Sequence, residues 1–153
     1  MTATNVPTMA PEPIPLVQHP RAALERAERA LERGRLSEAI DLLEQAVALE
    51  PANVEARTLA ADAYARTRRI ERAFAHLDAA LTADPHAFRP RCALGELYQR
   101  LAMPAEARPH FAAALACAAT PEERAYVRRI IRDDRAGDPR PNPGRRLRIV
   151  SRR

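Results

Sequence analysis

The sequence has no lysine and no tryptophan, only four glycines, and few aromatic side chains. Its two cysteines, Cys92 and Cys117, belong to no CxxC motif, so we expect neither a disulfide framework nor a zinc site. Residues 1–20 lack the apolar run of a secretory signal, and no stretch approaches the roughly 18 consecutive apolar residues of a membrane span. These absences predict a cytoplasmic protein without a metal or cofactor.

Groups that could carry catalysis are also scarce. Ser37 falls at an expected helix N-cap, and Ser151 lies near the end of the chain. The four histidines fall in different predicted elements, without the spacing of a nucleophile and its base. No glycine-rich loop is present that could cradle a phosphate. We therefore expect no catalytic residues, and the sequence argues against an enzyme.

The positive charge is concentrated at one end of the chain. Residues 1–127 hold 15 Arg against 17 Asp and Glu, a net charge of −2. Residues 128–153 hold 10 Arg against three Asp, a net charge of +7. The overall charge of +5 therefore describes the C-terminal segment, and the rest of the chain is slightly acidic.

Composition divides the chain into three parts. Abundant Ala and Leu, with interspersed Glu and Arg and few β-branched residues, predict an all-α domain over residues 20–134. Proline lacks a backbone donor, so the prolines near the start predict a flexible leader over 1–19. The stretch DPRPNPG and the arginines after it predict a Pro/Arg-rich basic tail over 135–153.

The central part of the chain repeats at a regular spacing. Three stretches align without gaps, LSEAIDLLEQAVALEP (36–51), IERAFAHLDAALTADP (70–85) and PAEARPHFAAALACAA (104–119). Shared columns hold alanine at 39, 73 and 107, alanine at 46, 80 and 114, and a larger apolar residue at 43, 77 and 111. Upstream, the small residues Ala27, Ala61 and Gly95 share a column where two helices would have to approach closely.

This pattern resembles the tetratricopeptide repeat, a helix–turn–helix unit of about 34 residues whose period matches the spacing of these columns. The resemblance covers three repeats, at about 20–53, 54–87 and 88–121. It is closest in the third repeat and weakest in the first helix of the first, where Ala30 replaces an aromatic residue. It implies an all-α fold, a right-handed α-solenoid of stacked helix–turn–helix units with about seven helices.

Local signals mark the expected turns and ends. Gly34 supplies a turn glycine in the first repeat, and Arg68 and Ala102 replace it in the other two. Pro109 stands inside the last predicted repeat helix, where proline removes a hydrogen bond.

A capping helix is expected over 121–134. Thr120 and Glu123 form a capping box around Pro121, a residue that is common at the first helical position. The arginines of this helix should face solvent, and its apolar side chains should pack on the third repeat. These apolar residues are Tyr126, Val127, Ile130 and Ile131.

In tetratricopeptide arrays the first helices line a concave groove that binds partner peptides, so the resemblance implies a candidate site. The expected groove residues are Leu24, Glu28, Leu31, Glu32, Leu59, Asp62, Arg66, Arg89, Glu96 and Arg100, with Glu25 beside them. Glu28, Asp62 and Glu96 form one acidic column in this set. Carboxylates pair bidentately with arginine, so the column predicts a basic or mixed-charge protein segment as partner. The alternative is that these acids belong to solvated helix faces.

The best-known subclass of the family grips acidic chaperone tails with a clamp of Lys, Asn and Arg. Here Leu24 and Glu28 stand where that clamp has Lys and Asn, and Leu59 and Ala93 replace other polar or basic members. A ligand carboxylate would be repelled at Glu28. The sequence therefore argues against the chaperone-clamp function.

Three functions stay open. The first is a protein-interaction module that acts as an adaptor or scaffold through the groove. The second is a subunit of a larger complex, docked through the leader and through tail residues that contact an acidic protein surface. The expected docking residues of the tail are Arg145, Arg146, Leu147, Arg148, Ile149, Arg152 and Arg153. The third, binding of nucleic acid or an anionic membrane by the tail, is disfavoured because no aromatic residue interleaves the arginines.

Overall fold

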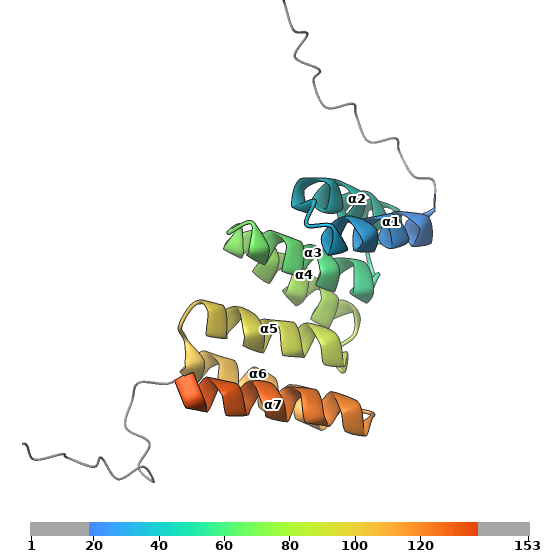
Figure 1. Cartoon of the computed structure of the whole chain (residues 1–153). Helices are drawn as coiled ribbons and strands as arrows, with labels where there is room; N and C mark the ends of the chain where they lie inside the picture. The colour runs from blue at the N-terminus through green and yellow to red at the C-terminus, as the bar shows by residue number, and fades with distance from the viewer. Residues whose placement is uncertain (1–18, 138–153) are drawn as a thin grey trace, which may run out of the picture. The chain divides into compact units, whose positions relative to one another are not determined.

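The computed structural model describes residues 19–137, which form seven α-helices and no strand (Figure 1). The all-α, helical-repeat expectation is confirmed for this part of the chain. The chain divides into two compact units, Met1–Pro85 (unit 1) and His86–Arg153 (unit 2), and the division falls two residues before the predicted boundary between the second and third repeats. The predicted leader, apart from His19, lies outside the described residues, and so do the docking residues expected at 145–153.

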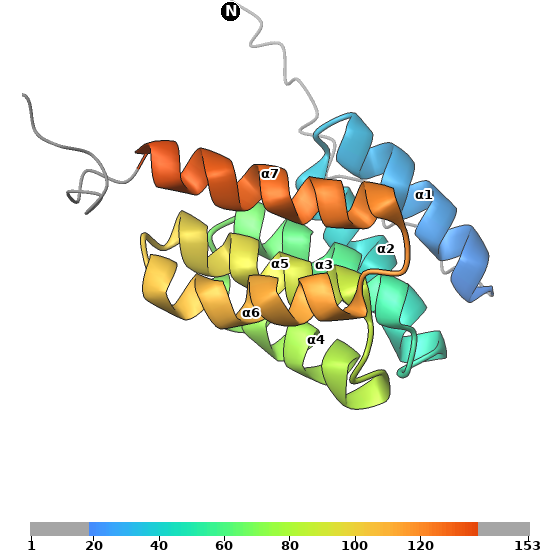
Figure 2. The ribbon, with the colours of Figure 1, turned by 90° about the horizontal axis from the view of Figure 1, so that it is seen from below.

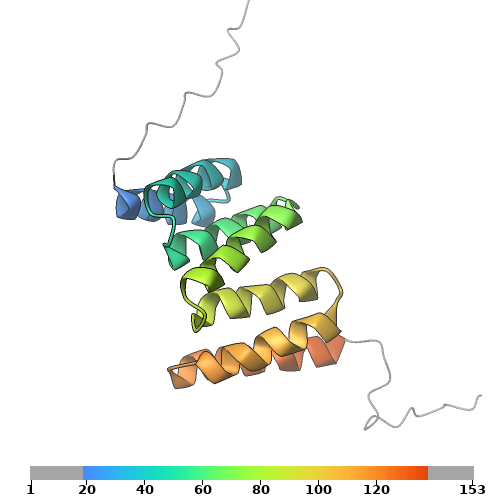
Figure 3. The same ribbon diagram turned by 180° about the vertical axis from the view of Figure 1, so that it is seen from behind.

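Unit 1 contains two helical hairpins. The first pairs α1 (Pro20–Glu32) with α2 (Leu36–Leu49), and the second pairs α3 (Val54–Arg66) with α4 (Ile70–Ala83). α2 also packs on α3, which joins the hairpins (Figure 3). The largest fully buried side chains are Leu42, Leu43, Tyr64 and Leu77. Alanines from all four helices fill the space between them, and their short side chains let the helices approach closely.

Unit 2 contains the third hairpin and one further helix. α5 (Phe88–Arg100) pairs with α6 (Pro104–Cys117), and α7 (Pro121–Gly137) runs along α6 (Figure 2). One buried cluster holds the three helices together, formed by Cys92, Ala107, Phe111, Ala114 and Val127. Ile130 and Ile131 pack against this cluster from α7. α7 therefore covers apolar surface that the α5–α6 hairpin alone would expose.

The contact between α5 and α6 depends on a glycine. A Cβ atom on Gly95 would lie 2.6 Å from Cε1 of Phe111. Phe111 belongs to the column that holds Leu43 and Leu77 in the other repeats, where the small partner is alanine. The third repeat therefore pairs glycine, the smallest residue of the first column, with phenylalanine, the largest residue of the second. The sequence prediction of close helix approach at this column is confirmed for Gly95.

Each hairpin turn has one residue in the left-handed region. The φ values are 71° at Gly34, 65° at Arg68 and 57° at Ala102. The three positions are equivalent in the three repeats, so the turn geometry is kept even where glycine is replaced. A side chain in this region costs roughly 1–2 kcal/mol because Cβ crowds the backbone.

We expect Arg68→Gly to stabilise the chain by about 1 kcal/mol, because the strain exceeds the entropy that an added glycine loses on folding. Urea unfolding followed by circular dichroism measures the change. Gly34→Ala is the matched control. No atom lies within 4 Å of a Cβ built there, so only the backbone strain changes and stability should fall. A less stable Arg68→Gly protein would contradict the expectation.

The start of α7 follows the predicted capping box. The backbone N–H of Glu123 donates to Thr120 Oγ1 (3.1 Å), and Glu123 Oε2 accepts from the backbone N–H groups of Ala119 (2.7 Å) and Thr120 (3.2 Å). Val127 is fully buried, as predicted. Tyr126 stays 40% exposed but reaches the third repeat through its hydroxyl, which donates to Glu96 of α5, so the predicted packing is confirmed only in part for this residue. α7 also runs three residues past the expected end at 134.

Two other local expectations had different outcomes. α2 begins at Leu36 with Arg35 at the N-cap, so Ser37 lies in the first turn and does not cap the helix. The repeat aligns helices but does not fix their starts to the residue. Pro109 lies inside α6, as predicted, and the helix continues to Cys117. Because Pro109 is exposed, the carbonyl that loses its helical donor lies on the solvent side.

Candidate functional site

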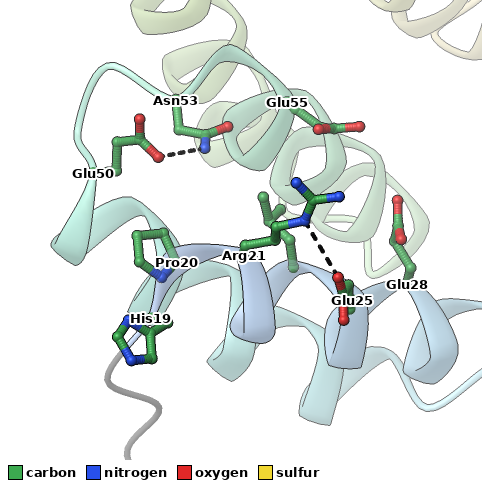
Figure 4. A pocket seen from close by; sticks show the side chains of 9 residues that line it. His19, Pro20, Arg21, Glu25, Glu28, Glu50, Asn53 and Glu55 are labelled. Atoms are coloured by element: carbon green, nitrogen blue, oxygen red, sulfur yellow. Dashed lines mark hydrogen bonds and ion pairs between the residues drawn. The ribbon is translucent and has the colours of Figure 1, made fainter.

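Unit 1 has a pocket of ≈ 620 Å³ beside the start of α1 (Figure 4). This volume lies in the range of ligand sites in proteins. The pocket is lined by His19, Pro20, Arg21, Leu24, Glu25, Glu28, Glu50, Asn53 and Glu55. Glu25 and Glu28 project from α1, whereas Glu55 comes from the first turn of α3 (Figure 4). Two helices and the turn between α2 and α3 therefore build the pocket.

The pocket lining is acidic, with four carboxylates against one guanidinium. The Nε atom of Arg21 lies 3.4 Å from Glu25 Oε1, and both side chains are largely exposed. Glu28 and Glu55 form no hydrogen bond or ion pair within residues 19–137, and both are exposed. Two carboxylates from different helices are thus available to an incoming cation.

The turn residues of the pocket are held by local hydrogen bonds. Asn53 caps α3: its Oδ1 accepts from the backbone N–H of Ala56 (2.9 Å). The Nδ2 of Asn53 donates to Glu50 Oε2 at 2.7 Å (Figure 4). The sequence did not predict the other lining residues, which are His19, Pro20, Arg21, Glu50, Asn53 and Glu55. The available signal was an Asn N-cap beside Pro51, but repeat columns do not reveal which turn lies against α1.

The predicted groove residues of unit 1 are only partly brought together. Leu24 and Glu28 line the pocket, and Leu24 is 8% exposed, so it offers little apolar surface. Asp62 forms an ion pair with Arg66 on the same helix (3.7 Å). The other three predicted groove residues of unit 1, Leu31, Glu32 and Leu59, do not line the pocket.

In unit 2, Glu96, the third residue of the predicted acidic column, forms a hydrogen bond with α7. The hydroxyl of Tyr126 donates to Glu96 Oε1 at 2.7 Å, and the Cys92 thiol donates to the same oxygen at 3.7 Å. Arg89 and Arg100 lie on the same helix and are exposed. The three column carboxylates therefore differ in their surroundings: Glu28 is exposed, Asp62 is paired with Arg66, and Glu96 is hydrogen-bonded to α7.

Burial raises the pKa of the Cys92 thiol to about 12, and the nearby Glu96 carboxylate adds to this effect. The pKa of Tyr126 is raised for the same two reasons, burial first. A nucleophilic cysteine must form a thiolate, and Cys92 stays protonated near neutral pH. The buried thiol is therefore part of the core cluster of unit 2.

A polar cluster links the two hairpins of unit 1. Glu44 Oε1 on α2 accepts a hydrogen bond from the Tyr64 hydroxyl (2.6 Å) and lies 3.1 Å from His76 Nε2. The rings of Tyr64 and His76 stack with centroids 5.3 Å apart. Burial, followed by the Glu44 hydrogen bond, raises the pKa of Tyr64. A second stacked pair, Tyr98 with His110, occupies the equivalent positions of the third repeat in unit 2, and the sequence analysis predicted neither pair.

Neither a metal site nor a membrane-spanning helix is present within residues 19–137. No group of three or more His, Cys, Asp or Glu side chains there could hold a metal ion. No helix in that range is long and apolar enough to cross a bilayer.

The tetratricopeptide repeat family model matches residues 20–88. The first TPR of Spaghetti (RPAP3), bound to the HSP90 peptide SRMEEVD, has the same fold with a TM-score of 0.64. The chain has the tetratricopeptide repeat fold, and its residues 20–88 match the family model. That neighbour is 20% identical, and the match covers 76% of this chain and 93% of the neighbour. The resemblance seen in the sequence is thereby confirmed.

Two further solved structures show the same tetratricopeptide fold. The Sgt2 TPR domain from Aspergillus fumigatus is 21% identical with a TM-score of 0.62, and the match covers 86% of this chain and 92% of that one. A thermophilic TPR protein from Thermus thermophilus is 23% identical with a TM-score of 0.64, and the match covers 74% of this chain and 66% of that one. No curated protein sequence matches the chain.

Proposed function

We propose that this protein is a non-enzymatic interaction module, an adaptor or scaffold, that binds a basic or mixed-charge segment of a partner protein in the unit 1 pocket. The observation that carries the proposal is the excess of carboxylates around that pocket, with Glu28 and Glu55 unpaired among residues 19–137.

The chemistry of the pocket favours arginine in the partner. A guanidinium offers a planar fork of donors that matches a carboxylate with two parallel hydrogen bonds. Glu28 and Glu55 come from different helices, so an arginine between them would contact both α1 and α3. The carboxylates would also speed encounter with a basic segment, more than they would add to affinity.

An acidic ligand fits this pocket poorly. The RPAP3 neighbour is bound to a peptide that ends in EEVD, which carries three carboxylate side chains. In this chain such an end would meet Glu25, Glu28, Glu50 and Glu55. Like charges at close range disfavour a partner, so we infer that this protein is not of the chaperone-clamp type.

The alternative function is that of an accessory subunit in a larger complex, docked by its leader and its tail. The tail carries the positive charge that an acidic protein surface would attract. Its docking residues lie outside the described range, so this alternative remains a prediction, as does a cytoplasmic location. Binding of nucleic acid or membrane stays disfavoured on the composition of the tail.

The pocket can be tested with two peptides. We expect the full chain to bind labelled GRRLRIVSRR, the sequence of residues 144–153, more tightly than SRMEEVD in fluorescence anisotropy. Glu28→Gln with Glu55→Gln should weaken binding of the basic peptide about tenfold, because two charge-assisted contacts are lost.

The matched control is Asp41→Asn with Asp78→Asn, which removes two exposed carboxylates from α2 and α4 outside the pocket. It should bind the basic peptide almost as the unmodified chain does. Equal weakening by both pairs would mean that the peptide responds only to net charge. Tighter binding of SRMEEVD would reverse the proposed preference.

A further inference from the structure

α7 presents a basic face to solvent. Arg128, Arg129 and Arg132 are exposed, and at 3.6 residues per turn Arg129 and Arg132 lie on the far side of the helix from the buried Val127 and Arg128 lies on its flank. Other arginines are paired with acids on their own helix or in its first turn, as in Arg21–Glu25, Arg35–Glu38 and Arg66–Asp62. Among residues 19–133, whose side chains the structure describes, none of the three α7 arginines forms an ion pair. The face therefore has positive charge that the chain does not neutralise locally.

The position of this face is fixed by the packing of α7. Val127 and the Tyr126–Glu96 hydrogen bond hold α7 on unit 2. Arg128 and Arg132 are one turn apart, about 6 Å along the helix axis. The guanidinium of Arg129 lies over the Tyr126 ring, 5.5 Å from its centroid. Tyr126 is the one aromatic residue of α7, so the face offers no series of aromatic platforms on which successive nucleic-acid bases could stack.

The same chain carries the complementary surface. The pocket of unit 1 has four carboxylates against one guanidinium, and Glu28 and Glu55 are exposed. We propose that the basic face of α7 in one copy docks on the unit 1 pocket of a second copy, with Arg128 and Arg132 directed at Glu28 and Glu55. This inference rests on the proposed function, because it names an occupant for the same pocket.

The contact would have a definite symmetry. It joins two different surfaces, so it is heterologous, and a pair of copies keeps one free α7 face and one free pocket. Copies would therefore add head to tail until a ring closes. Because the interacting groups are exposed, the association should be weak and strongly reduced by salt.

Sedimentation velocity of the full chain tests the contact. At about 50 mM salt we expect the average mass to rise with protein concentration, and at about 500 mM salt we expect the monomer. Two double variants then reverse the charge of one surface each. Arg128→Glu with Arg132→Glu changes the α7 face, and Glu28→Arg with Glu55→Arg changes the pocket. Each variant alone should stay monomeric. Their equimolar mixture should associate again, because the unaltered α7 face of the pocket variant meets the unaltered pocket of the α7 variant, and the two reversed surfaces are also complementary.

The control reverses two exposed arginines outside α7, Arg68→Glu with Arg108→Glu, and should still associate. Circular dichroism shows whether each variant is folded. A mass independent of concentration, or a mixture that stays monomeric while both variants are folded, would overturn the inference. So would association that is lost on deleting residues 138–153 but kept in Arg128→Glu with Arg132→Glu, because the tail would then be the occupant.

The peptide experiment keeps the two proposals separate. If GRRLRIVSRR binds through Glu28 and Glu55 while copies do not associate, the pocket takes basic segments of another protein, and only the self-association is wrong. If neither binding occurs, the proposed function fails as well.

Discussion

Gly95→Ala should destabilise the protein by about 1 kcal/mol, because overpacking a core outweighs the better helix propensity of alanine. The new Cβ would lie 2.6 Å from Cε1 of Phe111 and 2.8 Å from two further ring atoms. Phe111 is 2% exposed, so its ring cannot swing aside without disturbing the core cluster of unit 2. Overpacking of this kind costs roughly 1–3 kcal/mol, against about 1 kcal/mol gained from helix propensity. Urea unfolding followed by circular dichroism measures the balance.

The repeat itself supplies the rescuing substitution. Adding Phe111→Leu recreates the residue pair of the other two repeats, in which Ala27 and Ala61 accompany Leu43 and Leu77. Phe111→Leu alone should destabilise, because it leaves a cavity. We expect the double variant to be more stable than the two single effects predict, by at least about 1 kcal/mol. Additive effects would show that the contact between Gly95 and Phe111 does not limit the packing of α5 on α6.

Val127→Asp should destabilise unit 2 by about 3 kcal/mol or more, because an unpaired buried charge is costly. Val127 is 0% exposed and lies in the cluster with Cys92 and Phe111, where a carboxylate has no partner. The protein can avoid that cost only by releasing α7. Release would also break the hydrogen bond from Tyr126 to Glu96.

Release of α7 has a chemical readout. Burial is the main reason that the pKa of Cys92 stands at about 12. Exposure should lower it, so a thiol reagent should label Cys92 faster at mildly alkaline pH in Val127→Asp than in the unmodified chain. Arg128→Asp is the matched control, because the neighbouring residue is exposed on the same helix. Similar losses of stability in both variants would mean that α7 does not cover the core.

The sequence predicted features that recur with the repeat or depend on adjacent residues. The small residue at Gly95 followed from the repeat spacing, and the capping box of Thr120 and Glu123 is local. The exposure of Tyr126 and its bond to Glu96 are neither periodic nor local. They depend on how α7 lies over α5, which the packing of whole helices decides.

The candidate site was only partly predictable for the same reason. Glu28 came from the repeat columns, because the first helix of each repeat occupies an equivalent position. Glu50 and Asn53 contribute through the turn between α2 and α3, whose path depends on the Asn53 cap.

In the hairpin turns, by contrast, the sequence suggested a difference between the repeats that the structure does not have. Arg68 and Ala102 suggest altered turns, yet the backbone keeps the left-handed conformation found at Gly34. Packing of the helices on both sides of each turn outweighs the preference of one residue.

The cluster of Glu44, Tyr64 and His76 bears on how unit 1 comes apart. In a helical array, stability is close to a sum of terms for each repeat and for each nearest-neighbour interface. Glu44 belongs to the first repeat, whereas both of its partners belong to the second. If either repeat unfolded alone, the Glu44 carboxylate or the Tyr64 hydroxyl would lose its hydrogen-bond partner. The cluster therefore strengthens the coupling between neighbours, so the two hairpins of unit 1 should melt in a single cooperative transition.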